Sequence, residues 1–196
     1  MAKNVTFLGY SDTKPGEKLY QEAYGVAAEV AKAGYAVVNG GGSGVMRAST
    51  EGAHSVGGHA VGITFYPENI TFFEGRDEDN KVDELLETKT YVERTLKLLD
   101  YGDIYVIFNG GTGTISEFGM SWGLARLYFG RHKPLILFGG FWYPILEEIA
   151  RNMKLRKEEL EVYKIVTEVE QVVPAIREFE AKTPKRVDGM VLTTNG

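Results

Sequence analysis

The sequence contains no cysteine among its 196 residues. Disulfide bonds, thiolate metal sites and a cysteine nucleophile are therefore excluded, and the composition suits a reducing compartment. The chain also lacks any apolar run that approaches the roughly 20 residues needed to span a bilayer. Its first residues lead into a strand-like stretch and do not resemble a signal peptide. We therefore expect a cytoplasmic protein that has no membrane partner.

Positive charge is scarce as well. The chain has 22 Lys and Arg against 27 Asp and Glu, a formal net charge of -5. Binding to a nucleic-acid polymer, which requires many phosphates to be neutralised, is therefore not expected. The three histidines share no metal-ligand spacing and no lysine lies in a recognisable pyridoxal-phosphate motif, so neither a metal nor a cofactor is expected. A small anion remains possible, because a few backbone amides can hold one phosphate.

Short strand-like runs alternate with longer helical patterns along the chain. This alternation predicts an α/β fold with a single doubly wound parallel sheet, Rossmann-like, flanked by helices on both faces. We expect one nucleotide-binding domain over residues 1–182, followed by a tail, 183–196, that lacks a pattern and is a candidate for disorder. Strands are expected at residues 5–8, 35–38, 60–64, 85–86, 104–108, 134–138 and 163–166, and helices at 12–34, 45–56, 91–100, 114–129, 143–153 and 169–180.

Two glycine-rich stretches each follow a predicted strand and precede a predicted helix. The first is Gly40-Gly41-Gly42-Ser43-Gly44 and the second is Asn109-Gly110-Gly111-Thr112-Gly113-Thr114. Glycine lets the backbone approach an anion, and the free amides at a helix start point at it with the helix dipole behind them. Neither stretch is a Walker A loop or a complete dinucleotide fingerprint. The pair of stretches favours a phosphate site, and tight βα turns are the structural alternative.

Glu117 has two interpretations from spacing alone. Thr114-Ile115-Ser116-Glu117 has the form of a capping box, in which Glu117 bonds to a backbone amide at the helix start. A carboxylate beside a phosphate loop is equally suited to catalysis. The residues themselves leave both alternatives open.

The second stretch carries a family resemblance. Residues 109–117, Asn-Gly-Gly-Thr-Gly-Thr-Ile-Ser-Glu, resemble the P-G-G-x-G-T-x-x-E motif of the LOG family of cytokinin-activating phosphoribohydrolases. Residues 40–46 are similar to that family's other loop, and Arg94 lies where the family keeps an arginine. The order and spacing agree from about residue 5 to residue 149. This sequence departs at three positions, where Asn109 replaces a proline, Thr95 a lysine and Met120 an acid.

The resemblance implies hydrolysis of the N-glycosidic bond of a nucleoside 5'-monophosphate, giving the free base and ribose 5-phosphate. Glu117 and Arg94 would be catalytic, Glu117 at the ribose or at water and Arg94 at the phosphate. The structural alternative for Arg94 is a surface ion pair with Glu93 or Glu87. The implied substrate-binding residues are Gly41, Gly42, Ser43, Gly44, Met46, Thr95, Gly110, Gly111, Thr112, Gly113 and Thr114. A non-catalytic nucleotide-binding or molybdenum-cofactor carrier protein is the alternative function.

Two further features bear on partners. Residues 118–143 are rich in large apolar side chains, which suits either core packing or a subunit interface. The resemblance implies a homodimer or a larger oligomer, with the site close to the interface. Residues 65–81 have no periodicity, so we expect a long loop that selects the base of a small-molecule nucleotide.

Overall fold

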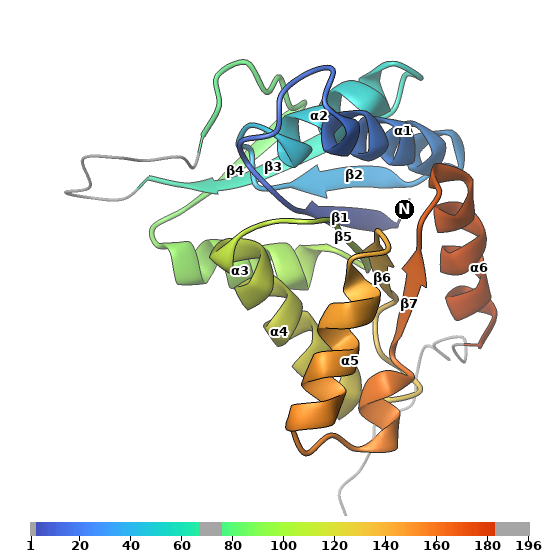
Figure 1. Cartoon of the computed structure of the whole chain (residues 1–196). Helices are drawn as coiled ribbons and strands as arrows, with labels where there is room; N and C mark the ends of the chain where they lie inside the picture. The colour runs from blue at the N-terminus through green and yellow to red at the C-terminus, as the bar shows by residue number, and fades with distance from the viewer. Residues whose placement is uncertain (1–2, 67–75, 183–196) are drawn as a thin grey trace, which may run out of the picture.

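The structure is a computed structural model that describes residues 3–66 and 76–182. Its centre is a seven-stranded, entirely parallel sheet in the order β4-β3-β2-β1-β5-β6-β7 (Figure 1). The chain builds one half outward from β1 to β4, then crosses back and builds the other half from β5 to β7. The strands are β1 (Asn4–Leu8), β2 (Ala36–Asn39), β3 (Ala60–Phe65), β4 (Glu84–Thr88), β5 (Ile104–Ile107), β6 (Leu135–Phe138) and β7 (Tyr163–Val166).

Within the described residues, six α-helices cover the two faces of the sheet (Figure 1). One core cluster joins the sheet to α1 (Lys18–Lys32), α2 (Val45–His54) and α6 (Val172–Lys182). The other joins it to α3 (Tyr91–Tyr101), α4 (Thr112–Leu127) and α5 (Trp142–Asn152). The predicted Rossmann-like architecture, with helices on both faces, is confirmed.

The central strands are apolar because both of their faces are buried. In β5, Ile104 and Val106 pack on the side of α1 and α2, whereas Tyr105 and Ile107 pack on the side of α3 and α4. A strand of this kind has no polar face, so it appears in the sequence as a continuous apolar run. These runs are what made the strands recognisable.

Several element boundaries differ from the predicted ones. The predicted helix start at residues 12–15 is wrong, since α1 begins at Lys18 and the residues before it form a turn in which the Thr13 hydroxyl donates to Glu17 at 2.9 Å. Two short 3-10 helices, Lys157–Leu160 and Val169–Gln171, were not predicted as such. The predicted tail lies outside the described residues, as does most of the expected base-selecting loop. Among the helices that the structure describes, none combines the length and apolar character needed to cross a membrane.

Candidate functional site

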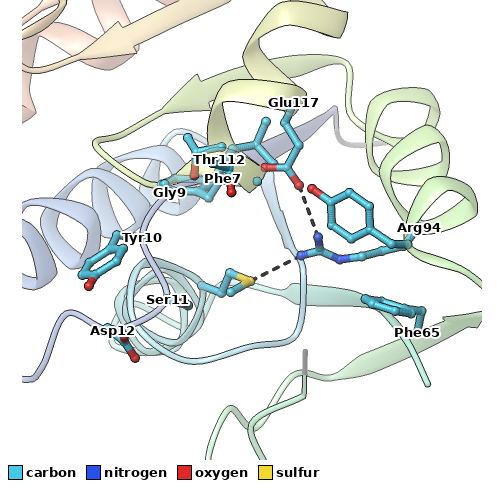
Figure 2. Close-up of a pocket in the computed structure, with 15 residues that line it drawn as sticks. Phe7, Gly9, Tyr10, Ser11, Asp12, Phe65, Arg94, Thr112 and Glu117 are labelled. Atoms are coloured by element: carbon cyan, nitrogen blue, oxygen red, sulfur yellow. Dashed lines mark hydrogen bonds and ion pairs between the residues drawn. The ribbon is translucent and has the colours of Figure 1, made fainter. Parts of the chain in front are cut away.

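A cavity lies where the strand order reverses, between the carboxyl ends of β1 and β5. In open α/β sheets this switch point is where ligands bind. The cavity has a volume of about 360 Å³, within the usual range for small-molecule sites. Figure 2 shows Tyr10 and Asp12 at one side of it and Arg94 and Phe65 at the other. Its walls come from β1, the β1–α1 turn, α2, β3, α3 and the start of α4, and comprise Phe7, Leu8, Gly9, Tyr10, Ser11, Asp12, Met46, Phe65, Tyr91, Arg94, Gly111, Thr112, Gly113, Thr114 and Glu117.

The second glycine stretch forms the start of α4 at the cavity wall. The N-cap residue is Gly111, so no side chain caps the first turn of the helix. The first amides of a helix have no partner within it and carry the positive end of its dipole. A β-carbon at Gly111 would meet no atom within 4 Å. This wall, which includes Gly111, Thr112, Gly113 and Thr114, therefore has uncapped backbone donors; that they bind an anion stays a prediction.

Glu117 and Arg94 form a buried ion pair in the cavity wall. Nη1 of Arg94 donates to Oε1 of Glu117 at 3.3 Å, and the two residues are 9% and 5% exposed. Nε of Arg94 also donates to the Ile63 carbonyl at 3.3 Å, and its guanidinium lies 5.8 Å from the Tyr91 ring centroid. Burial raises the pKa of Glu117 to about 7, against the opposing attraction of Arg94. The pair thus joins a fixed cation to a carboxyl group that changes protonation near neutral pH.

Both structural alternatives for these two residues are wrong. Helix α4 begins at Thr112, so Thr114 lies inside the first turn and cannot be the N-cap of a capping box. Glu117 lies one turn further on and bonds to Arg94. Arg94 is buried, and the carboxylate that it pairs with belongs to Glu117 and not to Glu93 or Glu87.

The first glycine stretch packs inside the protein. Of the predicted substrate-binding residues in this stretch and just after it, only Met46 lines the cavity. The Gly41 carbonyl accepts bonds from Arg76 Nη1 at 3.0 Å and from the Asp77 amide at 3.1 Å. The Gly42 carbonyl accepts from the Asn80 side chain at 2.8 Å. The expectation that Gly41, Gly42, Ser43 and Gly44 line the cleft is therefore corrected, because segments 9–12 and 76–80 already occupy their surroundings.

Two other predicted binding residues also lie outside the cavity wall. Thr95 is 2% exposed, and its hydroxyl has no partner among the described residues. A β-carbon at Gly110 would lie 2.1 Å from Oγ1 of Thr114, so this glycine allows the close approach of the turn to α4. Met120, at the position of the family's acid, is 38% exposed on the outer side of α4.

The β1–α1 turn lines the cavity, which the sequence patterns did not predict. Tyr10 bonds to the second glycine stretch and to the residue that directly follows the first, because its amide donates to the Asn109 carbonyl and its own carbonyl accepts from the Val45 amide, both at 2.9 Å. The Ser43 hydroxyl donates to the Ser11 carbonyl at 2.6 Å. The available signal was the glycine that directly follows the first strand, at the carboxyl edge of the predicted sheet.

An aromatic pair was missed too. Phe65 and Tyr91 contact edge to face, with their ring centroids 5.8 Å apart. The Tyr91 hydroxyl lies 3.1 Å from Oγ of Ser116. No spacing rule connects the end of one strand to the first residue of a later helix, so only the fold brings these rings together. Within residues 3–66 and 76–182, no group of three or more acidic or histidine side chains could hold a metal ion.

The fold and its switch-point cavity define a Rossmann-like α/β protein, and the comparisons identify its family. The chain belongs to the SLOG cluster4 family, whose model matches residues 2–173, which confirms the LOG resemblance. Cytokinin riboside 5'-monophosphate phosphoribohydrolase of Mycobacterium tuberculosis is 34% identical over 122 residues, which are 61% of this chain and 62% of that protein. The match therefore spans less than two thirds of the relative's length.

Solved structures share the fold over nearly the whole chain. The structural-genomics target TM1055 is 26% identical, with a TM-score of 0.65 over 90% of this chain and 99% of that one. The molybdenum cofactor binding protein of Rippkaea orientalis is 19% identical, with a TM-score of 0.68 over 92% of this chain and 98% of that one. At that identity the likeness shows the fold alone.

Proposed function

We propose that this protein hydrolyses the N-glycosidic bond of a nucleoside 5'-monophosphate. The observation that carries the proposal is the buried Glu117–Arg94 pair, which borders the same cavity as the uncapped start of α4. An anion site and a carboxylate within one small cavity suit a phosphorylated sugar whose reacting carbon lies a few bonds from its phosphate. The Mycobacterium tuberculosis relative is named as a phosphoribohydrolase of a riboside 5'-monophosphate, which supports this choice.

The phosphate would bind at the α4 start, on the amides of Thr112, Gly113 and Thr114. The ribose would then lie towards Glu117, which is one helical turn further along α4. Arg94 lies next to Glu117 and lines the same cavity, so its guanidinium would add positive charge to a cavity that takes a phosphate.

In the reaction, water attacks C1' of the ribose while the bond from C1' to the base breaks. The hydroxyl of water goes to C1', its remaining proton goes to the base, and the products are free base and ribose 5-phosphate. Positive charge develops on the ribose in the oxocarbenium-like transition state. The ionised form of Glu117 would stabilise that charge, or would accept the proton of the attacking water. Because burial raises its pKa to about 7, the carboxylate can both accept and return a proton near neutral pH.

The direct test is base release from a panel of nucleoside 5'-monophosphates, measured by liquid chromatography. We expect release from at least one of them. Glu117→Gln should lower the turnover about 100- to 1,000-fold, because the amide keeps the shape and loses the charge. The matched control is Glu147→Gln, which changes an exposed glutamate paired with Arg151 on α5. Full activity of Glu117→Gln would overturn the catalytic role of Glu117.

A non-catalytic carrier of a nucleotide or of molybdenum cofactor is the second candidate. It is favoured by Thr95, which stands where LOG proteins keep a lysine and is buried outside the cavity wall. A carrier would raise its melting temperature with ligand and release no base. That result with the whole panel would replace the hydrolase proposal.

We also propose that the protein forms a homodimer through the outer side of α4. This side exposes Ile115, Gly119, Met120, Gly123, Leu124 and Leu127, and its one charged residue, Arg126, is partly buried and pairs with Glu159 at 3.8 Å. Surfaces of monomers rarely present such a stretch, whereas the centre of an interface is depleted of charge. A two-fold axis would bring this largely apolar surface onto its own copy. The aromatic residues of 118–143 divide accordingly, since Phe118 and Trp142 are core residues and Tyr128 is exposed.

Light scattering after size exclusion tests the dimer. The wild-type chain should have twice the monomer mass, and Leu124→Glu should shift it to the monomer because a charge would be buried at the interface. Val56→Glu, a change at another exposed apolar residue just past the end of α2, should keep the dimer. A monomeric wild type at high micromolar concentration would refute the proposal.

A further inference from the structure

The guanidinium of Arg94 contacts several side-chain and backbone atoms of the described residues. Its Nε bonds to the Ile63 carbonyl at 3.3 Å, its Nη1 to Glu117 at 3.3 Å, and its Nη2 contacts the sulfur of Met46 at 3.6 Å. The Tyr91 ring centroid lies 5.8 Å from the guanidinium, and the backbone of Gly40 is a further neighbour. A β-carbon at Gly40 would lie 1.6 Å from Nη2 and 2.7 Å from Cζ of Arg94. The guanidinium therefore occupies the space that any side chain at position 40 would need.

The backbone around Gly40 is anchored by a buried polar network. The Asn39 carboxamide accepts from the Gly41 amide at 2.8 Å and donates to the Ser49 and Thr50 hydroxyls at 3.1 and 2.9 Å. On the other side, Asn80 bonds to the Gly42 carbonyl at 2.8 Å. Asn39 and Asn80 are fully buried. Moving this loop away from Arg94 would break hydrogen bonds that no water can replace, which is costly.

The atoms that a side chain at position 40 would displace are of a different kind. Besides the Arg94 tip, the third close atom is the sulfur of Met46, at 2.7 Å. Both belong to the ends of side chains, so they can shift while the backbone stays in place, although Arg94 then loses its bonds to Ile63 and Glu117. A substitution at Gly40 would thus leave the loop in place and move the arginine.

We infer that Gly40 is a positioning residue, whose missing side chain holds the Arg94 guanidinium against Glu117. The inference rests on the proposed function, in which this pair serves the reaction. It assigns the first glycine stretch a role in the site without any contact to substrate. It also explains why a glycine outside the cavity wall stands at the start of this stretch.

The test is Gly40→Ala, with Gly140→Ala as the matched control. At Gly140 an added β-carbon would meet only Thr167 Cγ2, at an ordinary 3.8 Å. We expect both variants to fold, with Gly40→Ala melting below wild type because its buried ion pair is broken. Gly40→Ala alone should lose base release about 100-fold, the cost of misplacing a reacting group by about 1 Å. Activity of Gly40→Ala equal to wild type would overturn the inference.

Two further measurements separate positioning from general damage. Lysine lacks the displaced Nη2, so Arg94→Lys should cost much less in the Gly40→Ala background than in wild type, whereas independent sites would give additive losses. Carbon NMR of labelled glutamate measures the pKa of Glu117 without any turnover, and Glu117→Gln assigns its signal. The charged groups lining the cavity are Arg94, Glu117 and Asp12, and withdrawal of the cation should raise the pKa of Glu117 in Gly40→Ala only.

The NMR result also keeps this inference distinct from the proposed function. If wild type releases no base, the hydrolase proposal fails, and a raised Glu117 pKa in Gly40→Ala still supports the positioning role. If wild type is active and the pKa of Glu117 is the same in both alanine variants, the positioning role fails and the hydrolase proposal stands.

Discussion

The two glycine-rich stretches resemble each other in sequence and differ in what surrounds them. Around the first, an added β-carbon would meet protein atoms at 1.6 Å at Gly40 and 2.3 Å at Gly44. Around the second, it would meet nothing within 4 Å at Gly111, and only the Tyr91 hydroxyl, at 3.3 Å, at Gly113. Glycine serves close packing in the first stretch, whereas in the second it gives an open backbone at Gly111 and Gly113 and close packing only at Gly110. Richness in glycine therefore predicts a close approach, and only the neighbours tell whether protein or ligand makes it.

The largest expected effect separates the stretches by stability. Gly44 has a φ of +62°, and a β-carbon there would lie 2.3 Å from the Tyr10 carbonyl oxygen. Gly44→Ala should therefore destabilise the protein by about 3 kcal/mol, from backbone strain and overpacking together. Gly111→Ala, with a φ of -89° and open space, should stay within about 0.5 kcal/mol of wild type. Urea unfolding measures both, and equal losses would contradict the comparison.

The stretches should also differ in their response to pH. The hydrogen bonds around the first involve amides, hydroxyls, backbone groups and the Arg76 guanidinium, whereas the helix that follows the second carries the buried carboxyl of Glu117. Burial raises the pKa of Glu117 from 4.5 to about 7, so between these values the folded chain binds more protons than the unfolded chain. The contribution of this residue to the free energy of unfolding should then be greatest below about pH 4.5 and should fall as pH rises to 7, by on the order of 2 to 3 kcal/mol.

Denaturation at a series of pH values, compared between wild type and Glu117→Gln, isolates this contribution. The glutamine variant should lose the fall between pH 4.5 and 7, because its side chain does not titrate. The control is Glu147→Gln, which changes an exposed glutamate. Asn39→Asp would not serve, because it places a charge among the buried hydrogen bonds around the first stretch. Identical pH profiles in wild type and Glu117→Gln would contradict an elevated pKa.

The smallest expected effect concerns ligand affinity at the second stretch. Gly111→Val should keep the fold and block the approach of a phosphate to the amides of α4. We expect the dissociation constant of a nucleoside 5'-monophosphate to rise at least tenfold, about 1.4 kcal/mol, while that of the unphosphorylated nucleoside stays the same. Isothermal titration calorimetry measures both. An equal loss for the two ligands would mean that this stretch shapes the cavity and does not bind phosphate.

Local patterns predicted the fold well and element starts less well. The apolar runs of the buried strands and the helical patterns between them were sufficient for the sheet. The predicted start of α1 was wrong because Thr13 resembles an N-cap, and the predicted start of α4 was wrong because of the apparent capping box. Both errors have the same cause, because Ser, Thr, Asp and Glu also form turn and side-chain bonds that have nothing to do with a helix N-cap.

The class of fold, the family and the carboxyl-edge location of the candidate site could be read from the order of the residues alone. These depend on hydrophobic periodicity and on short motifs, which are properties of neighbouring residues. Three features came from the folded chain instead: Arg94 pairs with Glu117, Phe65 contacts Tyr91, and the first glycine stretch faces Arg94 and lies outside the cavity wall. Each of these is a contact between elements far apart in the chain, and its geometry follows from how helices and strands pack across the sheet, which no local pattern records.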